Sequence, residues 1–384
     1  MMLHSVSTRP ALVLAAALTM PALATAQFQP RIAIVAAASA TATACAWTDP
    51  LQVLQQSGQF AVVDVYNVMT TGTGTPTLTT LLQYDAILTF TNGTPANNVA
   101  LGNVFADYVD AGGGVVVAVF ANSTTTAGRN IGGRWQNGYE VILDQSGNAS
   151  GAGGTLGTVQ VPGHPSMIGV TSFLGGSVGS RPNGTALEVG AFVVAEWNNG
   201  KILVAQGANP NRIDLGFYPI RSACSGSGYV SGGDQIMVNS MLAAAKGATF
   251  GPYGTGCAGS LGVPAWQAVT GSRPVLGQTL TTQVANAPLG LAVIGLGVSN
   301  TSSGLLTLPF DLGLIGMPGC SLLADPAVTE VAVGTPSGVP WSFTIPNVPI
   351  FLGFVIYGQA FPFDPTVNPF GFTATNGARI KVGL

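Results

Sequence analysis

From residue 31 to residue 120, short and almost wholly apolar runs alternate with stretches of helical periodicity. The apolar runs are residues 31–38, 60–67, 84–90 and 114–120. The helical stretches are residues 49–58, with Asp49 as the expected N-cap and Pro50 as the first helical residue, and residues 97–112. Strands that are apolar on both faces and separated by helices are typical of a parallel sheet covered on both sides. The sequence therefore predicts an α/β fold.

The chain from residue 121 to residue 185 is irregular and rich in Gly, Ser and Asn, with one expected strand at 155–161. Regular patterns then return, and they predict three strands and a helix at residues 186–197, 201–207, 212–218 and 231–247. We interpret residues 27–248 as one domain with a doubly wound, mostly parallel sheet.

Beyond residue 248 no helical period occurs. We interpret residues 249–256 as a linker. In residues 257–384, short apolar segments are separated by Pro and Gly turns, which favours an all-β antiparallel sandwich. A chain of 384 residues is too long for one ordinary core, so a second domain is expected.

Residues 1–26 have the features of a signal peptide. Arg9 precedes an apolar run at residues 11–24, and Ala24-Thr25-Ala26 forms an A-x-A-like cleavage site before Gln27. Pro21 and the shortness of the run argue against a membrane anchor, and no later run is typical of a membrane span. We expect the protein to be secreted or periplasmic.

Four cysteines occur, at positions 45, 224, 257 and 320. An even number in an exported protein favours disulfides over metal sites. Cys45 and Cys224 follow strands expected to end at the same sheet edge, so they are the natural first pair. Cys257 and Cys320 would then pair within the second domain, although two other pairings are compatible with the sequence. Because no C-x-x-C and no Cys/His cluster occurs, a zinc site is not expected. We also predict no other metal site and no cofactor.

Charged residues make up only 7% of the chain, against about a quarter in an average soluble domain. The net charge is −3 and no run of Lys or Arg occurs, so nucleic acid is not an expected partner. With 53 glycines and many Thr, Ser and Asn, the surface must be polar but mostly neutral. Few titratable groups are left for acid–base catalysis.

Four segments of residues 31–246 resemble the class I glutamine amidotransferase-like fold, most of all its ThuA-like relatives. They are "YDAILTF", "FADYVDAGGGVVVAVF", "GHPSMIGV" and "NGKILVAQGANPNRIDLGFYP". The resemblance implies a flavodoxin-like arrangement of strands. Residues 255–384 resemble a β-domain recurrent in secreted proteins of planctomycete-like bacteria, on segments that include "GTGCAGS" and "LPFDLGLIGMPGC". That second resemblance implies secretion and no particular activity.

The catalytic residues of the amidotransferases are absent from this sequence. That superfamily has a Cys nucleophile at a strand-to-helix turn and a later His-x-Glu, because the thiol needs a base. Here the turn reads Ala121-Asn122-Ser123, and no His-x-Glu occurs. Ser123 with His164 is the one substitute pair available. We favour a polar loop for Ser123 and a turn for His164, and we predict no catalytic residue.

Candidate ligand-binding residues follow from position, because open α/β sheets bind ligands at the carboxyl ends of their strands. The candidates are Asn92, Asn122, Ser123, Arg134, Trp135, His164 and Tyr218. Arg134 and Trp135 belong to the irregular insertion. An aromatic face beside an Arg suits a sugar ring, but we favour the alternative that both residues anchor the insertion by packing.

Two functions from different classes agree with these features. The first is a secreted, non-catalytic binding or cell-surface protein whose partner is a glycan or other envelope material. The second is a secreted hydrolase or carbohydrate-processing enzyme of ThuA-like type, which rests on fold-level analogy. We favour the first, because the nucleophile is missing and titratable groups are scarce. The sequence makes no prediction of the oligomeric state.

Overall fold

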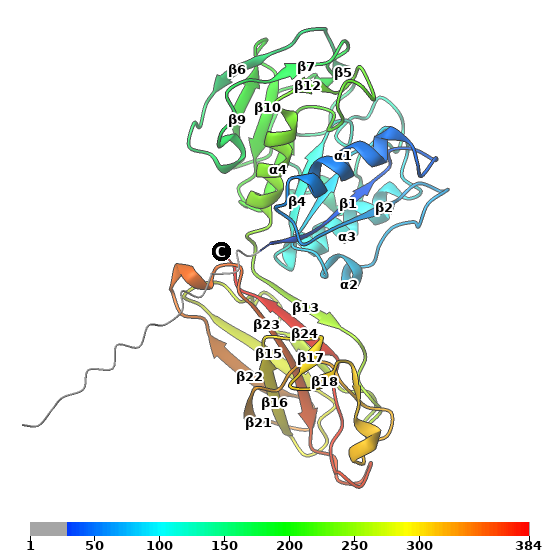
Figure 1. The fold of residues 1–384 in the computed structure, drawn as a ribbon, viewed down its shortest axis with the longest axis vertical. Coiled ribbons are helices and arrows are strands. Elements are labelled where there is room, and N and C mark those ends of the chain that lie inside the picture. The colour runs from blue at the N-terminus through cyan, green and yellow to red at the C-terminus, as the bar shows by residue number, and fades with distance from the viewer. Residues whose placement is uncertain (1–28, 384) are drawn as a thin grey trace, which may run out of the picture.

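The structure, a computed structural model, describes residues 29–383, and Figure 1 shows an α/β part followed by an all-β part. The predicted signal peptide, residues 1–26, lies outside the described residues. The α/β part begins with β1 (Arg31–Ala36), α1 (Cys45–Gln56), β2 (Val62–Asn67), α2 (Leu78–Leu81), β3 (Ala86–Thr89), α3 (Asn98–Asp110) and β4 (Gly114–Ala118). It continues with the 3-10 helix η1 (Gly133–Gln136), β5 (Asn148–Ala149), β6 (Leu156–Val159), η2 (Pro165–Met167), β7 (Leu174–Gly175), β8 (Arg181–Pro182), β9 (Phe192–Trp197), β10 (Ile202–Gln206), β11 (Arg212–Leu215), β12 (Tyr229–Ser231) and α4 (Gly233–Ala244).

Eight of these strands form one sheet in the order β2-β1-β3-β4-β11-β10-β9-β6. The five strands from β2 to β11 are parallel, whereas β10 is antiparallel to both β11 and β9, and β6 is antiparallel to β9. The sheet is therefore mixed, and the prediction of a mostly parallel sheet applies to one half of it. The connections from β9 to β10 and from β10 to β11 are too short for a crossover, so those neighbours have to be antiparallel.

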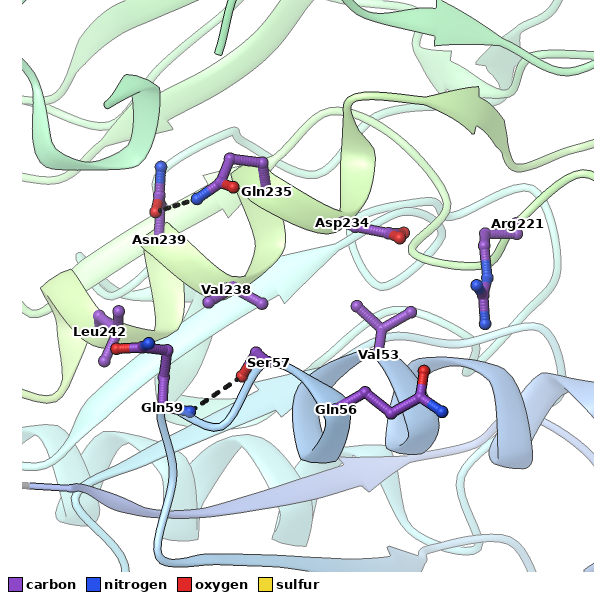
Figure 2. Close-up of a pocket in the computed structure, with 10 residues that line it drawn as sticks. All are labelled: Val53, Gln56, Ser57, Gln59, Arg221, Asp234, Gln235, Val238, Asn239 and Leu242. Atoms are coloured by element: carbon purple, nitrogen blue, oxygen red, sulfur yellow. Dashed lines mark hydrogen bonds between the residues drawn. The ribbon is translucent and has the colours of Figure 1, made fainter. Parts of the chain in front are cut away.

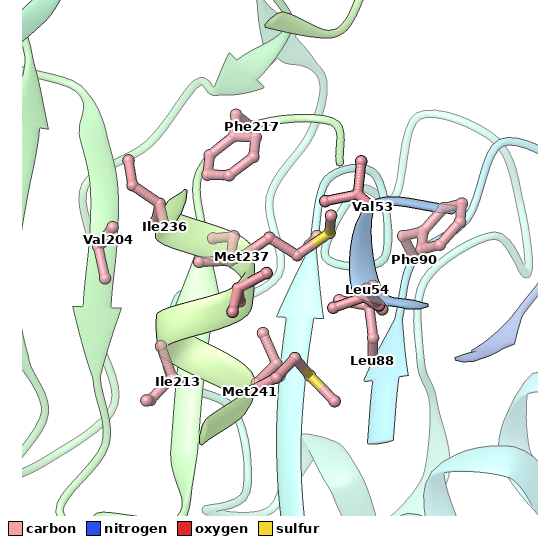
Figure 3. Packing of buried hydrophobic residues seen from close by; sticks show 14 of the residues in the cluster. Val53, Leu54, Leu88, Phe90, Val204, Ile213, Phe217, Ile236, Met237 and Met241 are labelled. Atoms are coloured by element: carbon pink, nitrogen blue, oxygen red, sulfur yellow. The ribbon is translucent and has the colours of Figure 1, made fainter. Parts of the chain in front are cut away.

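Helices cover both faces of the parallel half. On β1, Ile32 and Ile34 face a core with α1 and α4, whereas Ala33 and Val35 face a second core with α2 and α3. Figure 3 shows the first core, where Val53 and Leu54 of α1 and Met237 and Met241 of α4 pack near Leu88 and Phe90 at the end of β3. The continuous apolar runs in the sequence reflect this burial on both faces.

The start of α1 differs from its prediction. The helix begins at Cys45, one turn earlier than expected, so Pro50 lies inside it and Asp49 is not its N-cap. The Asp49 carboxylate instead accepts hydrogen bonds from the backbone N–H (2.6 Å) and the Nε–H (2.7 Å) of Arg221. The role of Asp49 is therefore a tertiary ion pair with Arg221 and not a helix cap. The other two long helices begin close to the predicted residues.

The all-β part contains two antiparallel sheets around one core, as a sandwich requires. Its longer strands are β13 (Thr249–Tyr253), β14 (Ala265–Ala268), β15 (Thr279–Ala285), β16 (Leu291–Gly297), β21 (Val328–Val333), β22 (Val339–Thr344), β23 (Val355–Pro362) and β24 (Gly377–Lys381). The short elements are β17 (Ser302–Ser303), β18 (Leu306–Thr307), β19 (Phe310–Asp311), η3 (Leu312–Ile315), β20 (Ser321–Leu322) and η4 (Pro349–Phe351). One sheet has the order β13-β24-β23-β16-β21 and the other β14-β15-β22.

Residues 249–253, interpreted from the sequence as linker, form β13 and pair with β24. The two parts also share buried charges. Asp85, at the start of β3, is fully buried and lies 3.0 Å from Nη1 of Arg379 and 3.2 Å from Nζ of Lys381, both on β24. Its other oxygen accepts the backbone N–H of Arg31 at 2.9 Å. A buried ion cluster therefore joins β24 to the amino end of the parallel sheet.

Both expected disulfides are present. Cys45 pairs with Cys224 at a Cα–Cα distance of 5.7 Å, and Cys257 pairs with Cys320 at 4.9 Å. The first links the start of α1 to the loop after β11, and the second lies in the β part. The prediction of these two pairs is confirmed.

Candidate functional site

The strand order reverses beside β1. After β1 the chain passes through α1 to β2 on one side, whereas β3 pairs with the other side of β1. Such a reversal leaves a crevice at the carboxyl ends of the two central strands, where open α/β sheets bind their ligands. Ala37, after β1, is bridged to Thr91, after β3, and its carbonyl accepts the N–H of Asn92 at 2.9 Å. These contacts fix Asn92 beside the crevice.

A cavity of about 290 Å³ lies at this place, and we call it the edge cavity. It is lined by Ala38, Ser39, Ala44, Cys45, Ala46, Asn92, Tyr218, Ile220, Cys224 and Ser225. These residues come from the loop after β1, the first turn of α1, the segment after β3 and the loop after β11. The edge cavity brings together two of the predicted ligand residues, Asn92 and Tyr218, and the Cys45–Cys224 disulfide forms part of its wall.

Tyr218 is 2% exposed, and its ring packs against Phe90 and Phe120 with centroid distances of 5.9 and 5.3 Å. Burial raises the pKa of its hydroxyl well above the usual range, so the group stays protonated. No described residue hydrogen-bonds this hydroxyl. The Tyr218 hydroxyl is therefore a hydrogen-bond donor held in place by packing. The described part of the chain supplies no acceptor for it.

The first turn of α1 contributes backbone donors. Its N-cap is Ala44, which has no side chain to accept from the helix. Among the described residues, the N–H groups of Cys45 and Ala46 have no acceptor, and both residues line the edge cavity. Backbone N–H groups at a helix N-terminus point out of the helix and carry partial positive charge.

Ser123 is buried and takes part in a different network. Its hydroxyl contacts Nη2 of Arg129 and Nδ2 of Asn148, both at 3.1 Å, and the Thr125 hydroxyl, also at 3.1 Å. Among its contacts in the described structure there is no imidazole, so no base is present to activate it. The neighbouring Asn122 is also buried, and its Oδ1 has no hydrogen-bond partner. Neither residue lines the edge cavity.

His164 caps η2. Its Nδ1 accepts the N–H of Ser166 at 3.1 Å, so Nε2 carries the proton and donates to Oε1 of Gln206 at 2.5 Å. Burial lowers the pKa of the ring, which favours this neutral form. Both nitrogens are used within the fold, as the turn interpretation of His164 expects.

Arg134 and Trp135 pack the insertion onto α3. Trp135 is 3% exposed, lies 5.8 Å from the Phe105 ring and has the Arg212 guanidinium 3.9 Å from its centroid. Arg134 pairs with Asp107 and Asp110 on the outside of α3. The Trp135 ring therefore has no open face for a sugar, and the packing alternative describes both residues.

The structure brings together the carboxyl groups of Glu140 and Asp214, which are buried, and of Asp144, which is half-buried, although spacing in the sequence does not pair them. Burial, with the negative charge of Asp144 close by, raises the pKa of Glu140 to about 8. Burial raises the pKa of Asp214 to about 6, although Arg212 opposes this shift. Asp214 accepts the N–H of Ile142 at 2.9 Å, so the cluster ties the insertion to β11. These three residues lie outside the edge cavity. No pattern in the sequence indicates that their carboxyl groups lie close together.

A larger groove of about 500 Å³ lies between α1 and α4, and Figure 2 shows the side chains that line it. Val53, Val238 and Leu242 are its apolar residues, and the rest are mostly amides and hydroxyls. Its two charges are already engaged, since Arg221 pairs with Asp49 and Asp234 accepts from Tyr229. The buried amide Asn239 donates to the Ile168 carbonyl at 2.8 Å and accepts from Gln235. The groove therefore offers few buried groups that need a partner.

No group of three or more His, Cys, Asp or Glu side chains within the described residues is arranged to hold a metal ion. Across residues 29–383, every helix is too short or too polar to cross a membrane.

No protein-family model and no curated protein matches this chain. Among solved structures, a ThuA-like protein from Parabacteroides merdae aligns at 14% identity over 56% of this chain and 90% of its own, with a TM-score of 0.37. A ThuA-like protein from Bacteroides uniformis aligns at 14% identity over 56% and 91%, with a TM-score of 0.36. Similarity at this level carries no ligand or activity to this chain. The resemblance of residues 255–384 to a planctomycete-like β-domain stays a prediction.

Proposed function

We propose that this protein is an exported, non-catalytic binding protein whose ligand occupies the edge cavity. The observation that carries the proposal is the composition of the cavity wall at the strand-order reversal. The polar groups that residues 29–383 supply to it are hydroxyls, one amide and backbone groups, with no carboxylate and no imidazole among them. Such groups hold and orient a ligand, but they do not exchange protons at neutral pH.

We propose a glycan, or other hydroxyl-rich envelope material, as the ligand class. Ser39, Asn92 and Ser225 offer neutral hydrogen-bonding groups, and Ile220 offers an apolar contact for C–H groups. A volume of about 290 Å³ is at the lower end for small-molecule sites, so one sugar unit of a longer chain is the fitting size.

A thermal-shift experiment on residues 27–384 with intact disulfides tests this function. The panel contains mono- and oligosaccharides, envelope polysaccharide fragments and nucleotides, and a ligand that binds the native state raises the Tm by mass action. We expect a sugar-dependent shift that Asn92→Ala removes and Gln59→Ala, in the α1–α4 groove, retains. A shift that only Gln59→Ala removes would place the ligand in that groove and refute the edge cavity. No shift with any sugar would refute the glycan class.

Export is tested separately. We expect the protein recovered outside the cytoplasm of its host to begin at Gln27, as read by N-terminal sequencing. An intact N-terminus on protein retained in the cytoplasm would contradict the signal peptide.

One observation favours the alternative of a carbohydrate-processing enzyme. Glu140 keeps its proton to about pH 8, as a general acid does. However, Glu140 already accepts the backbone N–H of Asp144 at 3.2 Å, and neither residue lines the edge cavity. Release of reducing sugar from the same panel, abolished by Glu140→Gln, would favour the enzyme over the binding protein.

A further inference from the structure

We propose that the edge cavity recognises an oxyanion, a carboxylate or a phosphate group, of its ligand at the N-terminus of α1. This inference rests on the proposed function, because it names the chemistry of the ligand that the same cavity would bind.

The first observation is the uncapped start of α1. The helix has 12 residues, and its N–H groups at Cys45 and Ala46 have no acceptor in the described structure, while both residues line the cavity. Such N–H groups bind anions because they are donors at the positive end of the helix dipole.

The second observation is independent of the helix. Tyr218 comes from the loop after β11, is 98% buried and lines the same cavity, yet no described residue hydrogen-bonds its hydroxyl. Its hydroxyl is therefore a donor in the cavity wall that no described residue uses, and it is available to an acceptor group of a ligand. Because the hydroxyl stays protonated, that acceptor can be an anion.

The remaining side chains add donors. The Ser39 oxygen already accepts the N–H of Thr41 at 3.1 Å, which leaves its own O–H to donate. The Asn92 side chain is exposed and has no hydrogen bond to any described residue, so its Nδ2 is also available. The N–H groups of Cys45 and Ala46 can only donate, and the Ser39, Asn92 and Tyr218 side chains can donate as well as accept. An oxyanion only accepts, so it can use all of these donors at once, and hydrogen bonds to a charged acceptor are the stronger ones.

Local charge does not oppose an anion. None of the acidic residues that the structure describes lines the cavity, and Asp49, the one acidic residue of α1, is paired with Arg221 at 2.7 Å. Its charge is compensated within the fold. The partial charge of the helix start and the neutral donors are then the groups that face the ligand.

Isothermal titration of residues 27–384 at constant ionic strength tests the proposal with three probes. Inorganic phosphate and D-glucuronate carry the oxyanion, and D-glucose is the neutral match of glucuronate. We expect at least one anion to bind about tenfold or more tightly than glucose, weakening as salt is raised. The anion that binds more tightly shows whether the cavity prefers a phosphate or a carboxylate group.

Three variants test where the anion binds. Asn92→Asp is nearly isosteric and exposed, adds a negative charge at the cavity, and is expected to weaken anion binding about tenfold. Gln59→Glu makes the same change of charge in the α1–α4 groove and is expected to have little effect. Tyr218→Phe removes only the hydroxyl and is expected to weaken anion binding several-fold.

The outcomes separate this inference from the proposed function. Equal binding of glucose and glucuronate, lost in Asn92→Asp, would overturn the oxyanion and leave glycan binding in the cavity. Anion binding that Gln59→Glu weakens as much as Asn92→Asp would also overturn it, because the site would lie elsewhere. If no probe binds and the sugar panel gives no Tm shift, both proposals fail.

Discussion

Replacing Asp85 by Asn tests whether buried charges join the two parts of the molecule. Asp85 is fully buried, and one carboxylate faces two cations, Arg379 and Lys381. Asn keeps the shape and one acceptor oxygen but removes the charge. The two cations, 7% and 0% exposed at their side chains, would then lose the carboxylate that both of them contact.

The size of the effect follows from this geometry. Removing one partner of a buried ion pair lowers the free energy of unfolding by about 3–5 kcal/mol, because a charge is left without compensation. Loss of the Lys381 proton limits the effect. Making a Lys neutral at pH 7 costs about 5 kcal/mol, since each pH unit below its reference pKa corresponds to about 1.4 kcal/mol. We therefore expect Asp85→Asn to lose about 3–5 kcal/mol, a large share of the stability of a typical protein.

Urea unfolding at pH 7, followed by tryptophan fluorescence and far-UV circular dichroism, measures this loss. The midpoint should fall with little change in slope. Asp107→Asn is the control, because Asp107 is exposed and its ion pair with Arg134 contributes little. The double variant Asp85→Asn/Lys381→Met should recover part of the loss. A loss below about 1 kcal/mol for Asp85→Asn would refute the reasoning, because it would mean that water solvates the cluster.

The pH dependence provides a second measurement on the same variant. The nearby cations Lys381 and Arg379 hold the pKa of Asp85 below its usual value despite burial. A lowered folded-state pKa contributes stability above the unfolded pKa, and this stability is lost as the pH falls through the folded value. The difference between wild type and Asp85→Asn should therefore be full at pH 7 and shrink in strong acid.

Three further changes test other parts of the fold. The pKa of Glu140 is raised to about 8, so the folded state holds a proton that the unfolded chain releases from about pH 4.5, and stability falls between these values. Glu140→Gln should gain on the order of 2–4 kcal/mol over wild type at pH 8 and nothing near pH 4, measured by urea unfolding; a constant difference would contradict the shift. Trp135→Ala should lower the free energy of unfolding by about 3–5 kcal/mol and leave ligand affinity unchanged. Lost affinity with retained stability would instead favour the interpretation that the Trp135 ring contacts a sugar. Cys257→Ser/Cys320→Ser removes the disulfide between two residues 63 positions apart and should lower the free energy of unfolding by about 2–5 kcal/mol, measured by thermal unfolding. No loss would mean that the two cysteines are not bonded in the wild type.

The strands of the parallel half could be predicted from the sequence because burial on both faces leaves a continuous apolar run. The start of α1 could not, since residues 40–46 read Ala-Thr-Ala-Thr-Ala-Cys-Ala and contain no capping signal at Ala44. Asp49 and Pro50 imitate a helix start one turn later, but Asp49 is used by Arg221, which is 172 residues away in sequence. Such a tertiary partner leaves no local pattern.

The error at residues 249–253 has a related cause. Gly251 and Pro252 are loop signals, yet β13 is the edge strand of its sheet, where Pro is tolerated because one side of the strand needs no ladder hydrogen bonds. The strand is visible only with its partner β24, which lies at the far end of the chain.

The candidate site was predictable as a location and not as a set of residues. Asn92, Asn122 and Tyr218 all follow strand ends, and this rule alone does not distinguish them. In the structure Asn92 and Tyr218 line the edge cavity, whereas Asn122 is buried in the loop that Arg129 and Asn148 hold through Ser123. Which strand-end residue faces the crevice depends on how the insertion folds back, and spacing does not encode that.

The scarcity of charge also has a structural meaning. Of 27 charged residues (12 Lys and Arg, 15 Asp and Glu), nine are buried in the described structure, among them Asp85, Arg212, Asp214 and Lys381. Buried charges of this kind are rare unless they are paired, and here most of them join segments that are distant in sequence. A third of the charged residues are therefore used inside the fold, and the described wall of the edge cavity consists of backbone groups and neutral side chains. A site built in this way can still select an anion, because the helix start supplies positive potential without a charged residue.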